Sequence, residues 1–176
     1  MRLRALFSGA RHQELALFWW IHLRWARQWL DRLMRWGTHL GSIWSCLIVG
    51  VTMWAFPTQR PLALTTTVAV AFSHLPVQIL KHAVQRPRPY LVLNGYRPLV
   101  APLRDHSFPS GHTTAAFAMA GVLSAAGPWV SGLVWPLAVL VGISRMYLGH
   151  HYPSDVLVGA FLGTFAAILS RTWILG

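Results

Sequence analysis

Acidic residues are scarce in this chain of 176 residues, which has 4 Asp and Glu against 15 Lys and Arg and a formal net charge of +11. Such a balance suits anionic partners: nucleic acid, anionic lipid or a phosphorylated substrate. The few carboxylates exclude a two-metal phosphoryl-transfer site, which draws on several of them. The carboxylate pair of a glycosidase and the histidine pattern of a zinc hydrolase are missing too.

Cysteine is almost absent, because Cys46 is the single one. An intrachain disulfide is therefore excluded. The sequence also has no internal repeat, no low-complexity tract and no second, soluble domain. Its basic start, "MRLRALFSGARHQ", has an apolar stretch too short for a cleaved signal peptide, so we expect it in the mature protein.

Long apolar runs dominate what is present: 55% of residues are hydrophobic, 11% are charged and the mean hydropathy is +0.45. This composition indicates a membrane protein and makes nucleic acid the least favoured partner. A weaker apolar run, residues 112–126, is rich in small residues and is predicted to pack inside a bundle. We predict an all-α, polytopic bundle of about five transmembrane helices. The other four predicted spans are residues 38–56, 61–80, 129–148 and 156–174.

An amphipathic pattern precedes the first predicted span. Aromatic and leucine side chains recur at helical spacing on one face, and mostly basic side chains recur on another. We therefore predict that residues 1–37 form an interfacial segment in the lipid headgroup layer and that residues 38–176 form the transmembrane domain. A helix packed on a soluble partner is the alternative. The apolar face comprises Phe18, Trp25, Trp29, Leu33 and Trp36, and the other face Arg24, Arg27, Asp31 and Arg35.

Alternate crossing of the membrane by the predicted spans gathers three polar segments on one face. They are "KHAVQRPRPY", "DHSFPSGH" and "SRMYLGHHYPSD". Ser110 is the expected N-cap of one helix and Pro153 the first residue of another, and helix N-termini bind anions. Basic side chains at helix C-termini have an ordinary explanation in the helix dipole, but Pro87 and Pro89 fix the direction of Arg88. Together these features predict a phosphate site. For cleaving a phosphate ester there remain an imidazole nucleophile held by a carboxylate, a second imidazole as acid, and cations.

Three motifs resemble those of the type 2 phosphatidic acid phosphatase family, which shares its active-site plan with vanadium haloperoxidases. Lys, six residues and Arg-Pro run from Lys81 to Pro89, and Pro-Ser-Gly-His runs from Pro109 to His112. Ser-Arg, five residues, His, three residues and Asp run from Ser144 to Asp155. The resemblance covers roughly residues 80 to 155.

The resemblance implies a role for each motif residue. His151 would attack phosphorus and form a phosphohistidine, Asp155 would hold its other ring nitrogen, and His112 would protonate the leaving oxygen. No metal and no cofactor would be required. The phosphoryl oxygens would be held by Lys81, Arg88 and Arg145 and by the backbone amides at Ser110 and Gly111.

Substrate and orientation stay open at this stage. We predict a lipid phosphatase or diphosphatase acting on an isoprenoid carrier diphosphate such as undecaprenyl diphosphate, with phosphatidylglycerophosphate or phosphatidic acid as alternatives. An anion-binding transporter subunit is the alternative of another class. Members of the family that these motifs resemble mostly have their site on the outer or lumenal face of the membrane, whereas the excess of cations on the site's face favours the cytoplasm. We predict a site on the extracytoplasmic face of the cell membrane. The sequence assigns no role to His150 or His74 and no oligomeric state.

Overall fold

The computed structural model describes residues 12–22, 27–93 and 99–176, so the predictions for Arg24 and Trp25 lie outside the described residues. Within these ranges the chain is helical and contains no strand. Residues 12–22 form the first helix. The elements that follow are α2 (Gln28–Gly37), η1 (Thr38–Gly41), α3 (Ile43–Trp54), η2 (Pro57–Gln59), α4 (Arg60–Val84), α5 (Pro89–Val92), α6 (Gly111–Leu123), η3 (Ser124–Ala126), α7 (Pro128–Tyr147) and α8 (Pro153–Ile174).

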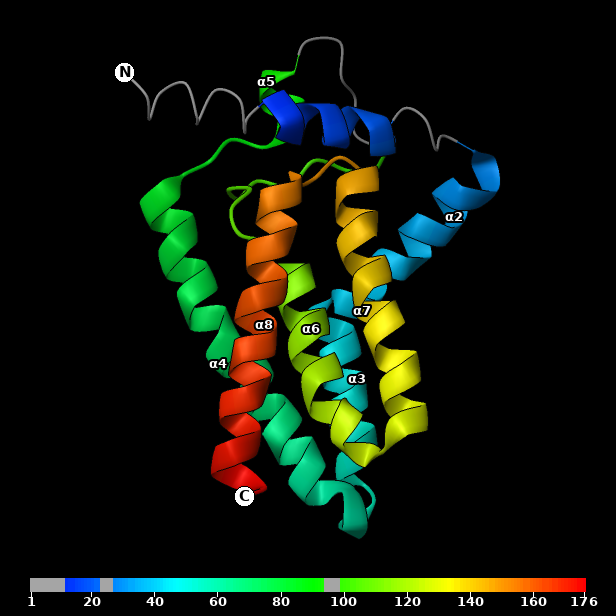
Figure 1. The fold of residues 1–176 in the computed structure, drawn as a ribbon, viewed down its shortest axis with the longest axis vertical. Coiled ribbons are helices and arrows are strands. Elements are labelled where there is room, and N and C mark those ends of the chain that lie inside the picture. The colour runs from blue at the N-terminus through cyan, green and yellow to red at the C-terminus, as the bar shows by residue number, and fades with distance from the viewer. Residues whose placement is uncertain (1–11, 23–26, 94–98) are drawn as a thin grey trace.

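Helix α6 forms the centre of the bundle and packs against α4, α7 and α8 (Figure 1). Nine of its 13 residues are buried. This agrees with the expectation that the small residues of 112–126 place that segment inside the bundle. Because α6 begins at Gly111, its position also fixes where the Pro-Ser-Gly-His motif lies.

Glycines bring α6 and α8 into backbone contact. A Cβ atom at Gly163 would lie 2.2 Å from the Thr114 carbonyl oxygen, and one at Gly159 would lie 2.7 Å from the Ser110 carbonyl oxygen. From the α6 side, a Cβ at Gly121 would lie 2.5 Å from the Cβ of Ala167. Residues 159–163, "GAFLG", place two glycines one helical turn apart, and these glycines allow close packing of α8 on α6 within one chain. The contact fixes the register of α6 against α8.

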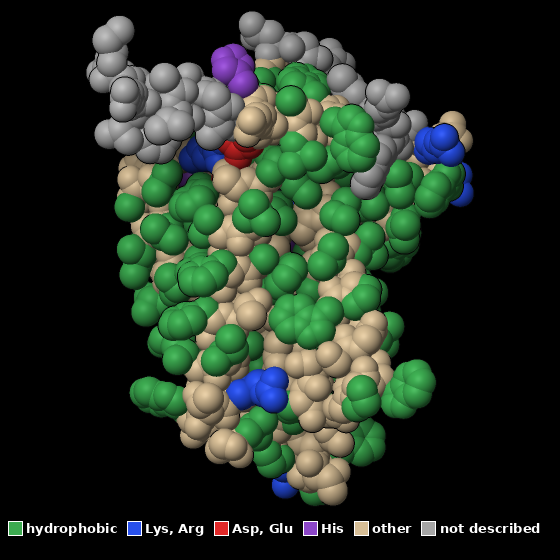
Figure 2. Space-filling model, in the orientation of Figure 1, with side chains coloured by type: hydrophobic (Ala, Val, Ile, Leu, Met, Phe, Trp, Pro, Cys, Tyr) green, Lys and Arg blue, Asp and Glu red, His purple; other side chains and the backbone are tan. Residues whose placement is uncertain are grey.

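Within the part of the chain that the structure describes, three segments are long and apolar enough to cross a membrane: Pro57–Val92, Pro128–Tyr147 and Pro153–Ile174. The predicted count of five is not confirmed, because α3 has 12 residues and α6 has 13. At 1.5 Å per residue these helices extend only about 18 and 20 Å, against about 30 Å of hydrocarbon. Hydrophobic side chains are spread over the whole visible flank of the bundle between its two ends, with few charged side chains among them (Figure 2). Such a surface fits contact with lipid.

The N-terminal segment is two helices in the described residues. The helix of residues 12–22 lies across the ends of α7 and α8, and α2 runs down beside α7 (Figure 1). Trp29 and Trp36 are 60% and 76% exposed, as a lipid-facing side requires. Phe18 was predicted on the same face but is fully buried beside Tyr152, with ring centroids 5.9 Å apart. A periodic stripe shows which residues share a face, but it does not show what covers that face.

Candidate active site

Residues from five parts of the chain meet at one end of the bundle. Lys81 lies near the end of α4, Arg145 lies in the last turn of α7, and His112 lies in the first turn of α6. Arg88 directly precedes α5, and His151 lies between α7 and α8. These five side chains line one cavity of about 260 Å³. The cavity is also lined by Gly111, Asp105, Leu103, Gln78, Val77, His74, Ala115 and three residues of the η1–α3 region.

Ser110 is the N-cap of α6, as predicted, and its hydroxyl accepts a hydrogen bond from the Thr113 N–H at 3.4 Å. The side chain is fully buried and does not line the cavity, whereas Gly111 does. A Cβ at Gly111 would meet only Val77 at 3.9 Å, so the glycine leaves the start of α6 uncovered. The backbone end of α6 therefore faces the cavity without a side chain in the way.

Arg88 and Lys81 share the carboxylate of Asp105. Arg88 Nη2 donates to Asp105 Oδ1 at 2.7 Å and Lys81 Nζ donates to Asp105 Oδ2 at 2.8 Å. Burial by itself raises the pKa of Asp105, but its hydrogen bond to Lys81 and the charges of Arg88 and Lys81 outweigh that effect and lower the pKa. Asp105 stays ionised at neutral pH and holds the two cations side by side at the cavity.

His151 has a defined tautomer. Its Nδ1 lies 2.7 Å from the carbonyl oxygen of Ser107. A carbonyl oxygen can only accept, so Nδ1 carries the proton and Nε2 of the neutral ring carries the lone pair. Burial first, and the charges of Arg145 and Arg88 next, lower the pKa of His151 well below its usual value. The ring is therefore neutral at physiological pH, and its Nε2 accepts a hydrogen bond from Arg88 Nη1 at 3.3 Å. An incoming phosphate that takes over the Arg88 donor would leave the Nε2 lone pair to act as a nucleophile.

Asp155 supports this arrangement from behind. Its Oδ2 lies 3.6 Å from His151 Nδ1, accepts the Ser107 hydroxyl and accepts the Tyr152 N–H at 2.8 Å. Its Oδ1 accepts from Arg86 Nη1 at 2.8 Å. The direct acceptor of the His151 proton is thus the Ser107 carbonyl, and the buried carboxylate fixes the position of Ser107.

Arg145 keeps two nitrogens available. Its Nη1 donates to Thr38 Oγ1 at 2.8 Å, whereas its buried Nε and Nη2 have no partner among the described residues. His150, next to the nucleophile, is also buried, and burial followed by the charges of Arg145 and Arg88 lowers its pKa to about 3. Its carbonyl oxygen accepts from Arg88 Nη1 at 2.9 Å. His150 is neutral beside the cations, while Arg145 still has hydrogen-bond donors for an anion in the cavity.

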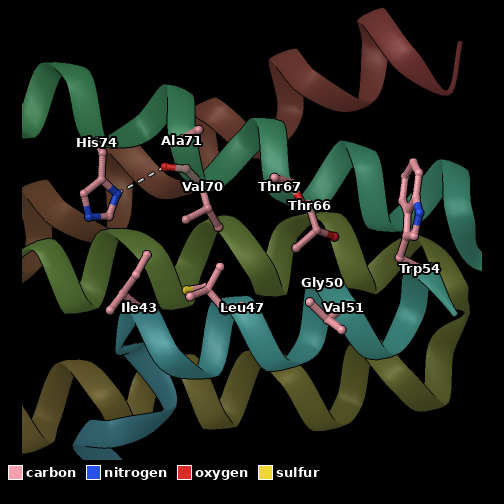
Figure 3. Close-up of a pocket in the computed structure, with 11 residues that line it drawn as sticks. Ile43, Leu47, Gly50, Val51, Trp54, Thr66, Thr67, Val70, Ala71 and His74 are labelled. Carbon is pink, nitrogen blue, oxygen red and sulfur yellow. Dashed lines mark hydrogen bonds between the residues drawn. The ribbon is translucent and has the colours of Figure 1, made fainter.

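An apolar groove of about 430 Å³ lies between α3 and α4. Figure 3 shows His74 and Ile43 at one end of it and Trp54 at the other. Thr66 and Thr67 line it, but their hydroxyls donate to carbonyl oxygens of their own helix. His74 Nδ1 likewise donates to the Val70 carbonyl oxygen at 3.1 Å, so the polar side chain inside α4 has a partner. The groove and the basic cavity share three lining residues: Ile43, Cys46 and His74.

Sequence reasoning missed the groups that hold the predicted site residues in place. Asp105 binds Lys81 and Arg88. The Ser107 carbonyl binds His151, and the Thr38 hydroxyl binds Arg145. The scarcity of acids could have directed attention to Asp105, but a loop carbonyl and a distant threonine leave no periodic signal. Among the described residues, no group of three or more His, Cys, Asp and Glu side chains is arranged to hold a metal ion.

Comparison with known proteins gives a family for this arrangement. The sequence model described as the PAP2 superfamily matches residues 62–175, which include all three motifs. The undecaprenyl-diphosphatase of Sulfolobus acidocaldarius is 28% identical over 144 residues, which are 80% of this chain and 69% of that protein.

Two solved structures share the fold. The crystal structure of Aquifex aeolicus LpxE superposes with a TM-score of 0.83 at 31% identity and covers 90% of this chain and 94% of its own. A Bacillus subtilis protein described as a transmembrane PAP2 type phosphatidylglycerolphosphate phosphatase has a TM-score of 0.79 at 28% identity, with coverage of 94% and 86%.

Several curated relatives are longer than the matched part. The match spans 63% of the length of one Escherichia coli relative. It spans less than half of several others, among them lipid A 1-phosphatases of Rhizobium species. The comparisons therefore establish kinship and fold for the matched region.

Proposed function

The chain belongs to the PAP2 superfamily, and from this membership we propose that it is a membrane lipid phosphatase or diphosphatase. One observation supports the proposal above the others: a neutral histidine whose Nε2 is unprotonated and accepts from Arg88 lines a basic cavity that shares its wall with an apolar groove. A lipid phosphate needs both parts at once. Its headgroup requires cations and a nucleophile, and its tail requires an apolar channel between helices.

We propose that the reaction has two steps. His112 takes up a proton as the anionic phosphate binds beside it. His151 Nε2 attacks phosphorus, the bond to the leaving oxygen breaks, and His112 gives that proton to the leaving oxygen. The neutral His112 then takes a proton from water, whose oxygen attacks phosphorus, so that the bond from phosphorus to His151 Nε2 breaks and inorganic phosphate is released. In the transition state of each step, negative charge is spread over the equatorial oxygens of the phosphoryl group. Preorganised hydrogen-bond donors and cations stabilise that charge most strongly.

The phosphoryl oxygens would be held by cations and by backbone N–H groups that line the cavity. Arg145 offers its unpartnered Nε and Nη2. Arg88 and Lys81 offer charge while Asp105 keeps their side chains in place. The backbone at Ser110 and Gly111 presents the N-terminus of α6. Asp155 acts through Ser107 on His151 and does not reach the substrate in this scheme.

For the tail we propose the α3–α4 groove (Figure 3). An isoprenoid carrier diphosphate such as undecaprenyl diphosphate remains our first choice, which the name of the Sulfolobus relative supports. Phosphatidylglycerophosphate, phosphatidic acid and a lipid A 1-phosphate are the competing substrates. The N-terminal segment 1–37 is proposed as the interfacial part and residues 38–176 as the catalytic domain. The exposed Trp29 and Trp36 support this division.

The test is a side-by-side assay of phosphate release by the purified full chain in detergent. Undecaprenyl diphosphate, phosphatidylglycerophosphate, phosphatidic acid and lipid A 1-phosphate are supplied at equal mole fraction, each with and without chelator. We expect activity that survives chelation, with the isoprenyl diphosphate turned over fastest. Activity that disappears with chelator contradicts the phosphohistidine scheme.

Two substitutions test the proposed roles. His151→Ala should abolish phosphate release, and His112→Ala should stop leaving-group protonation while leaving a folded protein. Near-normal turnover by His151→Ala would overturn the assignment of the nucleophile. A reporter fused near Gln59 tests the orientation: signal on the cytoplasmic side there places the site on the extracytoplasmic face.

A further inference from the structure

The helix of residues 12–22 reaches the catalytic end of the bundle through one carboxylate. Glu14 Oε2 accepts from Arg86 Nη2 at 2.7 Å. Its Oε1 accepts from the Ser154 backbone N–H at 3.1 Å and from the Ser154 hydroxyl. Glu14 is one of four acidic residues in the chain, and it lies outside residues 62–175 that the family model matches.

Glu14 supplies a missing partner at the start of α8. That helix begins at Pro153, and the first backbone N–H groups of a helix have no partner inside it. The Ser154 N–H is one of them, and it finds the Glu14 carboxylate from a segment 140 residues away in sequence. An anion at a helix N-terminus is stabilising. The contact fixes the first turn of α8, which also carries Asp155.

Arg86 connects Glu14 to Asp155. Its Nη1 donates to Asp155 Oδ1 at 2.8 Å while its Nη2 donates to Glu14. The same guanidinium lies over the Tyr152 ring, 3.9 Å from its centroid, and donates to the Ser154 hydroxyl at 2.7 Å. Asp155 is fully buried, so the Arg86 guanidinium that pairs with it must be held accurately.

The helix itself is held firmly at this place. Phe18 is fully buried beside Tyr152, and His22 Nδ1 donates to the Tyr147 carbonyl oxygen at 2.8 Å. Phe18 is one helical turn beyond Glu14 and His22 two turns beyond, so the three side chains share the face that meets the ends of α7 and α8. Glu14 is thus aimed by packing that does not depend on Glu14.

We propose that Glu14 is a positioning residue for the reaction. It holds Arg86 and the first turn of α8, these hold Asp155 and Ser107, and the Ser107 carbonyl holds the Nδ1–H of His151. The inference rests on the proposed function, because it concerns the same nucleophile. It makes the N-terminal helix part of the catalytic apparatus.

The test compares Glu14→Gln with wild type in the full chain in detergent, with farnesyl diphosphate as the substrate. We expect kcat to fall roughly 10- to 100-fold, since small displacements of reacting groups have effects of that size. KM should change less than about twofold, because the groups that bind phosphate are untouched. Glu14→Asp should recover part of kcat. The matched control is Gln13→Ala, an exposed neighbour on the same helix, which should keep wild-type kcat.

A double-mutant cycle separates positioning from general loss of stability. Ser154→Ala removes one group that Glu14 binds, so the combined Glu14→Gln, Ser154→Ala variant should lose less than the product of the two single losses. Multiplicative losses, a loss confined to KM, or unchanged kcat in Glu14→Gln would each overturn the proposal. So would an equal loss in Gln13→Ala.

A readout without substrate distinguishes this inference from the proposed function. The Nδ1–H proton of His151 should give a low-field NMR signal through its bond to the Ser107 carbonyl. The signal should shift or broaden in Glu14→Gln and stay in place in Gln13→Ala. A signal unmoved by Glu14→Gln contradicts the inference even where wild type proves inactive on farnesyl diphosphate and on the four lipids. That inactivity contradicts the proposed function alone.

Discussion

Gly163→Ala should slow catalysis although the residue lies far from the reacting atoms. The added Cβ would be 2.2 Å from the Thr114 carbonyl oxygen and 2.9 Å from the Ala118 nitrogen, both of them backbone atoms of α6. Comfortable carbon contacts are about 3.5 Å or longer, so α8 must move away by roughly 1 Å. Such overpacking costs about 1–3 kcal/mol of stability.

The same movement reaches the site because α8 is one rigid helix. Gly163 is about 12 Å along the helix from Asp155, and displacement of the first turn alters the Asp155, Ser107 and His151 contacts. A misplacement of about 1 Å can reduce the rate by roughly 100-fold. We expect kcat for a lipid phosphate to fall by up to that factor.

The assay measures kcat, KM and the thermal unfolding midpoint of Gly163→Ala in detergent. Gly132→Ala is the matched control, because a Cβ at Gly132 in α7 meets nothing within 4 Å. Removing that helical glycine should raise stability slightly, by about 0.5–1 kcal/mol, and leave kcat unchanged. Wild-type kcat together with a wild-type midpoint in Gly163→Ala would refute the argument that the glycine contact fixes the site.

Three further predictions concern other parts of the structure. Thr38→Val removes the described partner of Arg145 Nη1. Since a hydrogen bond to a charged group contributes about 1.5–3 kcal/mol, kcat/KM should fall at least about tenfold. The control is Thr65→Val, because the Thr65 hydroxyl donates within its own helix; it should keep wild-type kcat/KM, and equal losses in both variants would contradict the role of Thr38. Ile43, Cys46 and His74 form the seam between the groove and the cavity, and Ile43→Trp fills it. Hydrolysis of a long-chain lipid phosphate should therefore fall, while hydrolysis of p-nitrophenyl phosphate stays near the wild-type rate. Parallel losses on both substrates would show that the groove does not hold the tail. Burial and nearby cations lower the pKa of His150 to about 3 in the folded protein, against about 6.5 in the unfolded chain, so between these pH values the unfolded state binds more protons. The thermal unfolding midpoint should therefore drop as the pH falls from 6.5 towards 3, and it should drop less steeply in His150→Asn. A midpoint that rises on acidification would contradict the reasoning.

Much of the architecture could be predicted because helices and their ends leave local signals. Ser110 and Pro153 are the N-cap and the first residue of their helices, as their types suggest. Helix order then brings the three motifs to one end of the bundle, and the suspected family is confirmed by the match to residues 62–175. The span count was less secure, since apolar run length does not show where α3 and α6 begin and end.

The contacts that hold the site together were beyond sequence reasoning. Asp105 and Ser107 act from a loop, and Glu14 acts from a helix 140 residues before its partner Ser154. Such contacts exist only once the helices have packed, so no spacing encodes them. Phe18 shows the same limit. Its helical spacing predicted which face of the helix it shares, but not that Tyr152 would pack against it in the folded protein. The face of the membrane that carries the site stays a prediction.

The seam of Ile43, Cys46 and His74 has an evolutionary consequence. On one side of it, backbone contacts between α6 and α8 leave no space for larger residues at Gly159 and Gly163, whereas the groove between α3 and α4 has room for other side chains. Under the proposed function, substitutions that line the groove would alter which tail is accepted without touching the proposed catalytic residues. Such changes along α3 would allow related proteins to use different lipids with the same chemistry, and the similar proteins do carry the names of different lipid phosphatases.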